Sequence, residues 1–165
     1  MIVVSNSSPL IALARIGQLN LLTSLFKQIL IPAEVQHEVT VVGRGLAGAE
    51  EVRNANWIEV KAYKSPADPS LTQACQNLGA GERGAILLAK SLPADLVLLD
   101  EWKARHVAQA AGLPITGCLG VLEAGARKSL VANLRQAYVD LLRQGIRFDI
   151  KLLQDSLARF GLPKL

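Results

Sequence analysis

Short apolar runs alternate along the chain with longer segments in which apolar residues recur at helical spacing. The runs are rich in Val, Ile and Leu, as in strands buried on both faces, and cover residues 2–4, 29–31, 57–60 and 96–99, with a brief edge strand at 114–116. Helices are predicted at residues 10–16, 19–26, 32–38, 49–54, 71–78, 82–91 and 102–111, with two or three more over 119–160. This alternation predicts an α/β domain with a central, mainly parallel sheet. Right-handed crossovers place its helices on both faces, which gives three layers, α/β/α.

Turn-forming residues separate these segments without dividing the chain into domains. Ser8 and Pro9 are typical of a helix start, with a hydroxyl N-cap and proline at the first helical position. Residues 41–48 hold three glycines and are expected to form a mobile loop. The stretch 64–70, with two prolines, is linker-like but too short to separate domains. We therefore expect one domain over residues 1–165, with the C-terminal helices packed on it.

The composition excludes several classes of protein. Half of the 165 residues are hydrophobic and 19% are charged, which excludes a disordered chain. No apolar run is long enough to span a membrane, and the N-terminus lacks the basic segment of a secretory signal. Cys75 and Cys118 match no metal or redox spacing, so we expect a cytoplasmic protein. The net charge of +4 is mild but compatible with a nucleic-acid partner.

Polar residues follow two of the predicted strands, where the chemistry of parallel sheets is usually found. Asn6 follows the first strand, Asp100 and Glu101 follow the strand at 96–99, and Glu82 opens the helix before that strand. Each has a plain structural alternative, as a helix N-cap, a partner of a helix dipole or a turn former. However, carboxylates gathered at one edge repel one another unless a cation neutralises them. Hard oxygen ligands with open positions suit Mg²⁺ or Mn²⁺.

Four stretches of the chain carry a resemblance to a known family. They are VVSNSSPLIALARIGQLNLL near the start, ILIPAEVQHEV, LGAGERGAILLAKSLPADLVLLDEWKARHVAQAAGLPITGCLGVL and the closing GIRFDIKLLQDSLARFG. In order and spacing they resemble PIN-domain proteins, in a branch that is catalogued as a domain of unknown function and is close to bacterial toxin nucleases. The resemblance implies a Mg²⁺- or Mn²⁺-dependent ribonuclease fold, often the toxin half of a toxin–antitoxin pair. It further implies RNA as substrate, a homodimer and a small antitoxin protein as partner.

The resemblance also implies which residues form the metal site. The acid of the first strand falls on Asn6, where PIN nucleases normally carry aspartate. The remaining acids fall on Glu38, which alone would be interpreted as a surface residue, and on Glu82, Asp100 and Glu101. In this hypothesis Glu38, Glu82 and Asp100 are catalytic. With Asn6 and Glu101 as further ligands, they bind one or two cations that activate water for in-line attack on an RNA phosphodiester.

Substrate contacts are expected from a polar residue and three basic ones near the same edge. These are Ser8 beside Asn6, Lys103 and Arg105 on the helix after the acidic pair, and Arg44 in the glycine-rich loop. Their structural alternative is ordinary solvated surface. Aromatic residues make up only 4% of the chain, which argues against base-stacking platforms and favours metal and phosphate contacts.

Asn6 leaves a second hypothesis open. Its amide carries no charge, so the chain is alternatively a catalytically degenerate PIN-like module that binds RNA or a protein partner without cleaving. A phospho-acceptor role for Asp100 fits poorly, because no companion acidic pair and lysine occur in the expected order. The apolar helices at 10–16 and 19–26 favour a dimer surface, unless the C-terminal helices cover them within one monomer.

Overall fold

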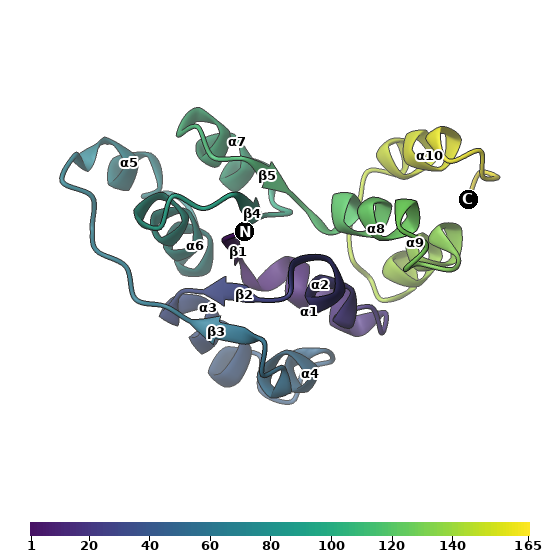
Figure 1. Ribbon diagram of the computed structural model, residues 1–165, viewed down its shortest axis with the longest axis horizontal. Helices are drawn as coiled ribbons and strands as arrows, with labels where there is room; N and C mark the ends of the chain where they lie inside the picture. Colours follow the sequence, from purple (N-terminus) through teal and green to yellow (C-terminus); the bar gives the residue numbers. More distant parts are fainter.

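Five parallel strands form the centre of the molecule. The structure is a computed structural model that describes residues 1–165. The strands are β1 Val3–Ser5, β2 Ile29–Ile31, β3 Ile58–Val60, β4 Leu96–Leu98 and β5 Ile115–Thr116. They pair in the order β3-β2-β1-β4-β5, and all four pairings are parallel (Figure 1). The carboxyl ends of all the strands therefore lie at one edge of the sheet, as the sequence predicts.

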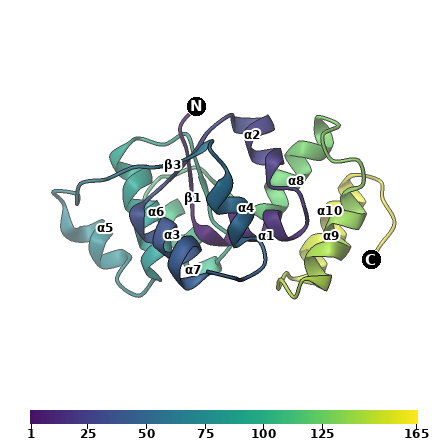
Figure 2. The same ribbon diagram turned by 90° about the horizontal axis from the view of Figure 1, so that it is seen from below.

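Helices connect the strands and extend the chain beyond them. Before β4 lie α1 Ser7–Arg15, α2 Asn20–Phe26, α3 Ala33–His37, a π-helix at Glu38–Val42, α4 Ala49–Asn54, α5 Pro69–Ala74 and α6 Ala80–Ser91. After β4 lie α7 Trp102–Ala110, α8 Cys118–Arg127, α9 Leu134–Arg143 and α10 Ile150–Arg159. Figure 1 shows α5, α6 and α7 on one side of the strands, and the turned view of Figure 2 shows α8, α9 and α10 grouped at the other end.

The apolar strands fill two separate cores. Val3 and Ile29 belong to the larger core, which includes buried residues of α1, α2, α4, α8, α9 and α10. Val4 and Leu30, the next residues along the same strands, belong to a smaller core with α6 and α7. Successive side chains of a strand point to opposite faces, so a sheet covered on both faces needs unbroken apolar runs. The sheet is therefore the middle layer of a three-layer α/β/α fold, which confirms the predicted class.

The C-terminal helices add to the larger core. α8 packs against both α1 and α2, whose residues Leu13 and Leu22 are fully buried. The apolar faces of α1 and α2 are thus covered largely within the monomer. The sequence left this covering open as the alternative to a dimer surface on these two helices. No single helix is long and apolar enough to cross a membrane; only α1 and α2 taken together, bent by 120°, have the length and composition.

Two segments near the predicted site differ from the expectation. α1 begins at Ser7, so Ser8 is not its N-cap. The chain after α3 continues as a π-helix through residue 42, so only the later part of 41–48 consists of turns. In the π-helix the N–H of Gly43 donates to the Glu38 carbonyl, five residues earlier, at 2.7 Å. π-Helical turns are rare in proteins overall, but those that occur are often found at functional sites. This one begins at Glu38, a predicted site residue.

Gly125 tests how tightly the C-terminal layer packs. A Cβ at this position in α8 would lie 2.7 Å from Leu21 Cδ1 and 2.8 Å from Val131 Cγ2. Helix propensity alone favours Gly→Ala by about 1 kcal/mol, whereas overpacking a core costs about 1–3 kcal/mol. We expect Gly125→Ala to lower the free energy of unfolding, measured by urea denaturation. A rise would mean that helix propensity outweighs packing here.

Candidate active site

The carboxyl ends of β1 and β4 bring two predicted site residues to one edge. Asn6 directly follows β1, and its backbone N–H donates to the carbonyl of Leu98 in β4 at 3.1 Å. Asp100 lies two residues beyond that carbonyl. Asn6 is only 2% exposed, and its side chain does not cap α1 although it occupies the N-cap position. The burial of Asn6 and its lack of a capping hydrogen bond indicate that it has a role other than capping.

Asp100 is held by the start of α8. Its Oδ1 accepts a hydrogen bond from the backbone N–H of Cys118 at 2.7 Å, and no protein group donates to Oδ2. The preceding residue must be glycine, because a Cβ at Gly117 would lie 2.4 Å from Oδ1. Burial raises the pKa of Asp100, while the Cys118 N–H and the Arg105 charge act in the opposite direction. The result is a half-buried carboxyl group with one oxygen free of protein hydrogen bonds.

Glu38 lies between two other elements of the edge. Its Oε1 accepts a hydrogen bond from the N–H of Gly81 at 2.8 Å, and its Oε2 accepts one from the Ser7 hydroxyl. The Ser7 hydroxyl also lies 3.5 Å from the Asn6 side-chain oxygen. Glu38 is thus part of a contact chain that joins the π-helix, α1 and α6. The sequence resemblance selected Glu38, whereas its own sequence context suggested only solvated surface.

Glu82 and Glu101 each contact the start of their own helix. Glu82 Oε2 accepts from the N–H of Gly79 at 3.1 Å, and Glu101 Oε2 accepts from the N–H of Ala104 at 3.1 Å. Burial is the main cause that raises the pKa of Glu82, and the negative charges of Glu101 and Glu38 raise it further. These three carboxyl groups therefore interact electrostatically across the edge.

One feature is common to all four acidic residues of the predicted site. Each accepts a hydrogen bond from a backbone N–H at the start of α6, α7 or α8. Such N–H groups lack partners within the helix, and the helix dipole adds partial positive charge there. Capping and a functional role are therefore not exclusive alternatives at these positions.

The donor atoms suit a divalent cation, but the full predicted ligand set is not assembled into one cluster. No three His, Cys, Asp or Glu residues lie close enough together to hold a metal ion. Asp100, Glu82 and Glu101 each keep one carboxylate oxygen free of protein hydrogen bonds. Mg²⁺ usually binds through one or two carboxylates together with water and substrate phosphates. The residues present fit that kind of open site rather than a closed protein cage.

A cavity of about 290 Å³ opens beside Asp100. Residues of α1 and of the connection between α9 and α10 line it, among them Ser7, Ser8, Arg15, Ile146 and Phe148. Ser8 thus lines the same cavity as Asp100. Ile146 and Phe148 lie within the closing stretch GIRFDIKLLQDSLARFG that carries part of the resemblance, but the sequence predicts no role for them, because only tertiary packing brings this connection to the edge.

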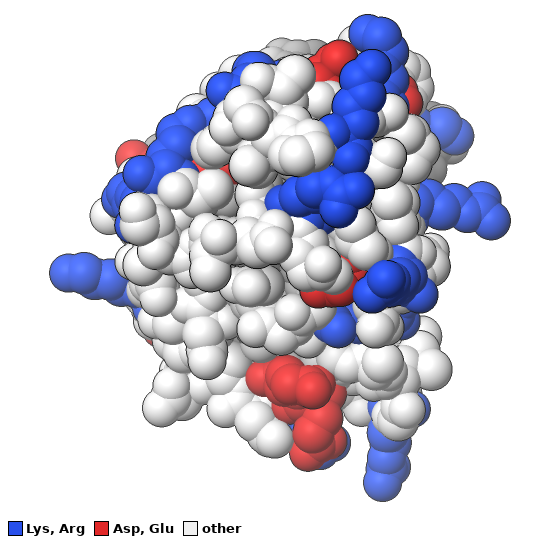
Figure 3. Space-filling view, turned by 90° about the vertical axis from the view of Figure 1, so that its right-hand side faces the viewer, with Lys and Arg blue, Asp and Glu red and all other residues white.

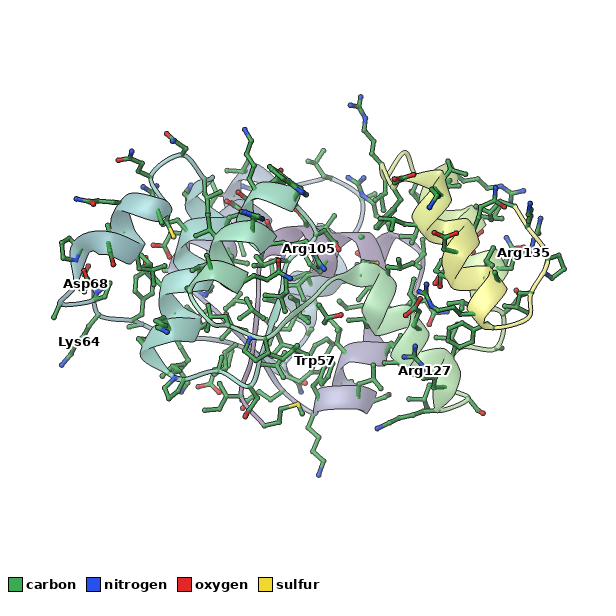
Figure 4. All side chains as sticks on the ribbon, turned by 90° about the horizontal axis from the view of Figure 1, so that it is seen from above. Trp57, Lys64, Asp68, Arg105, Arg127 and Arg135 are labelled. Carbon is green, nitrogen blue, oxygen red and sulfur yellow. The ribbon has the colours of Figure 1, made fainter.

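The three predicted basic contacts have different environments. Arg105 is half-buried, and its guanidinium donates to the carbonyl of Leu99 at 2.8 Å. Figure 4 shows Arg105 in the middle of the molecule, away from Arg127 and Arg135 on the C-terminal helices. Lys103 on α7 and Arg44 after the π-helix are exposed. Arg105 therefore supports the strand end beside Asp100, whereas the two exposed side chains can reach a ligand.

The acids at the carboxyl edge of this three-layer parallel α/β fold mark that edge as the candidate active site. The chain matches a family model described as a PIN domain over residues 2–162. Because this match spans nearly the whole chain, the protein belongs to the PIN-domain family, whose members generally use divalent metal ions. No curated protein and no solved structure matched the chain.

The raised pKa of Asp100 predicts an inverse pH dependence of stability. The folded protein binds a proton at Asp100 more readily than the unfolded chain does, so this residue's contribution to stability falls as pH rises through its folded pKa. We expect Asp100→Asn to gain stability relative to the wild type as pH rises from about 4, the usual aspartate pKa, through the raised pKa of the folded protein. Urea denaturation at several pH values measures this difference.

Asp68 is the matched control. The Ser70 N–H lowers its pKa, so Asp68→Asn should lose relative stability as pH rises over the acidic range. The same pH trend in both variants would contradict the interpretation.

Proposed function

We propose that the protein is a PIN-type endoribonuclease that cleaves phosphodiester bonds of single-stranded RNA with Mg²⁺ or Mn²⁺. The observation that carries the proposal is the group of acids at the carboxyl edge, beside the cavity that Asp100 lines. Catalysis is assigned to Glu38, Glu82 and Asp100, with Asn6 and Glu101 as further ligands. Family membership supports the assignment, and so do the free carboxylate oxygens of Glu82, Asp100 and Glu101.

The residues at this edge would have different roles in binding the cation and the substrate. Asp100 and Glu82 would hold a cation through their free oxygens. A bound divalent cation lowers the pKa of a coordinated water and neutralises charge on the phosphodiester. Glu38 is fixed by the Ser7 hydroxyl and the Gly81 N–H, so it is suited to orienting a ligand or a water molecule. Asn6 contributes an uncharged oxygen, which lowers the negative charge of the site.

The distribution of charge supports an anionic substrate. Residues 118–165 hold eight Lys and Arg against four Asp and Glu, so the net charge of +4 lies entirely in this segment. Figure 3 views this end of the molecule and shows several Lys and Arg side chains around a largely uncharged central area, with a smaller group of acidic side chains in its lower part. Positive surface potential raises the rate at which polyanions associate. Lys103 and Arg44 would add phosphate contacts close to the acids, and Arg105 and Ser8 would support them.

We further propose that the protein acts in the cytoplasm as the toxin of a toxin–antitoxin pair and forms a homodimer. An exposed apolar segment directly after Glu38 supports a protein partner: Val41, Val42 and Leu46 are 59%, 68% and 59% exposed. An antitoxin bound there would lie next to the acids. Light scattering at micromolar concentration tests the dimer, and a monomer would contradict it.

The nuclease proposal predicts metal-dependent cleavage that requires Asp100. We expect the wild type to cut single-stranded RNA with Mg²⁺ or Mn²⁺, and both Asp100→Ala and a chelator to abolish cutting. Loss of a charge-stabilising group typically lowers the rate by about 10²–10³-fold or more. Asp155→Ala, on the exposed face of α10, is the control and should retain activity. Undiminished cutting by Asp100→Ala would refute the mechanism.

A second candidate function is a PIN-like module that binds without cleaving. Asn6 and the lack of a three-acid cluster favour it. Calorimetric titration with Mg²⁺ and Mn²⁺ separates the two candidates, because only the nuclease needs a cation. A folded protein that binds neither ion at millimolar concentration would support the binding module.

A further inference from the structure

One of the two tryptophans is exposed to solvent. Trp102 is 70% exposed, although tryptophan normally buries most of its surface. Its indole ring stacks on the imidazole of His106 one helical turn later, with ring centroids 5.5 Å apart and 21° between the ring planes. α7 therefore presents an ordered aromatic pair to solvent rather than to a core.

The ring pair lies at the edge that carries the acids. Trp102 is the first residue of α7, and the Glu101 carboxylate before it accepts a hydrogen bond from the Ala104 N–H in the same turn. Arg105, on the next turn, donates to the carbonyl of Leu99 at the end of β4. These two contacts place the start of α7, and with it the ring of Trp102, at the carboxyl edge next to Asp100 in the chain.

A lysine lies next to Trp102 in the sequence, and a cavity lies beside His106. Lys103 is exposed next to Trp102 in the sequence. His106 also lines a cavity of about 460 Å³ between α7 and α5, together with Lys90 and Asp68. Proteins bind single-stranded nucleic acid by stacking bases on aromatic rings while cations contact the phosphates. The cores of protein interfaces, by contrast, are depleted in charged residues. The surroundings of Trp102 thus favour a base over an apolar protein side chain.

We propose that Trp102 and His106 form a stacking platform for one base of single-stranded RNA, with Lys103 contacting a neighbouring phosphate. This inference rests on the proposed function, since it assigns the base-binding position of the same site. A platform of this kind holds a strand without reading its sequence, because every base has a flat face. The platform would act together with the metal and phosphate contacts that the low aromatic content favours.

Tryptophan fluorescence provides the first measurement. Trp57 precedes β3 at the amino edge of the sheet, opposite the acids, so Trp57→Phe leaves Trp102 as the only reporter at the site. In this background we expect octauridylate to quench the fluorescence, in chelator so that no cutting competes. An abasic octamer with the same number of phosphates should leave the fluorescence nearly unchanged.

Binding of labelled octamers, followed by anisotropy, provides the second measurement. Stacking contributes about 1–3 kcal/mol per base, so Trp102→Ala should weaken octauridylate binding about 5- to 150-fold and abasic binding by less than about twofold. Trp102→Phe keeps a ring and should lose less. Circular dichroism confirms that each variant is folded.

Each alternative outcome has a distinct meaning. Equal weakening for both octamers would overturn the stacking role. Loss of a dimer in Trp102→Ala with unchanged octamer affinity would show a protein interface instead, and would also overturn it. If the wild type does not cut RNA but octauridylate binding depends on Trp102, the nuclease proposal fails and the platform stands. If the wild type cuts RNA and Trp102→Ala changes neither affinity nor KM, only the platform fails.

Discussion

The carboxyl edge depends on backbone N–H groups that begin helices. Four acids, Glu38, Glu82, Asp100 and Glu101, lie at one edge of the sheet, and each is bound by an N–H from α6, α7 or α8. In a parallel sheet every crossover helix that leaves the carboxyl edge begins there, so partial positive charge accumulates where the chain places its acids. Mutual repulsion of the carboxylates is thereby reduced without a cation.

Close approach of backbones makes these hydrogen bonds possible. A Cβ at Gly81 would lie 2.5 Å from both carboxylate oxygens of Glu38. The contact repeats at Glu34, one turn before Glu38, and at Gly84, one turn after Gly81. A Cβ at Gly84 would lie 2.8 Å from Glu34 Oε2. Two glutamates on the helical segment 33–42 thus rest on two glycines of α6, and Tyr63 donates to the other oxygen of Glu34 at 2.6 Å. The position of Glu38 is set by packing between helices as much as by its own helix.

Sequence patterns predicted what depends on local order and missed what depends on tertiary packing. Strand order along the chain placed Asn6 and Asp100 at one edge, because parallel strands share the direction of their ends. The helix starts before Glu82 and Trp102 carried local signals and were found within a few residues. The contact between Ser7 and Glu38 had no local sequence signal. The serine–proline pair predicted a helix start at Ser8, but the helix begins at Ser7 and Ser8 is not its N-cap. Phe148 lies in a stretch that carries the family resemblance, but its place in the cavity could not be predicted, because that place depends on how the C-terminal helices pack.

The separation of charge along the chain has a consequence for encounters in solution. The first 117 residues carry balanced charge, whereas residues 118–165 carry the whole excess of +4. The molecule is therefore an electric dipole with its positive pole on the C-terminal helices. In the field of a long polyanion it would rotate before contact and arrive with that pole foremost, and added salt would shorten the range of this alignment. Phe148, which lies between the last two helices and lines the cavity beside Asp100, connects this positive pole with the acidic edge.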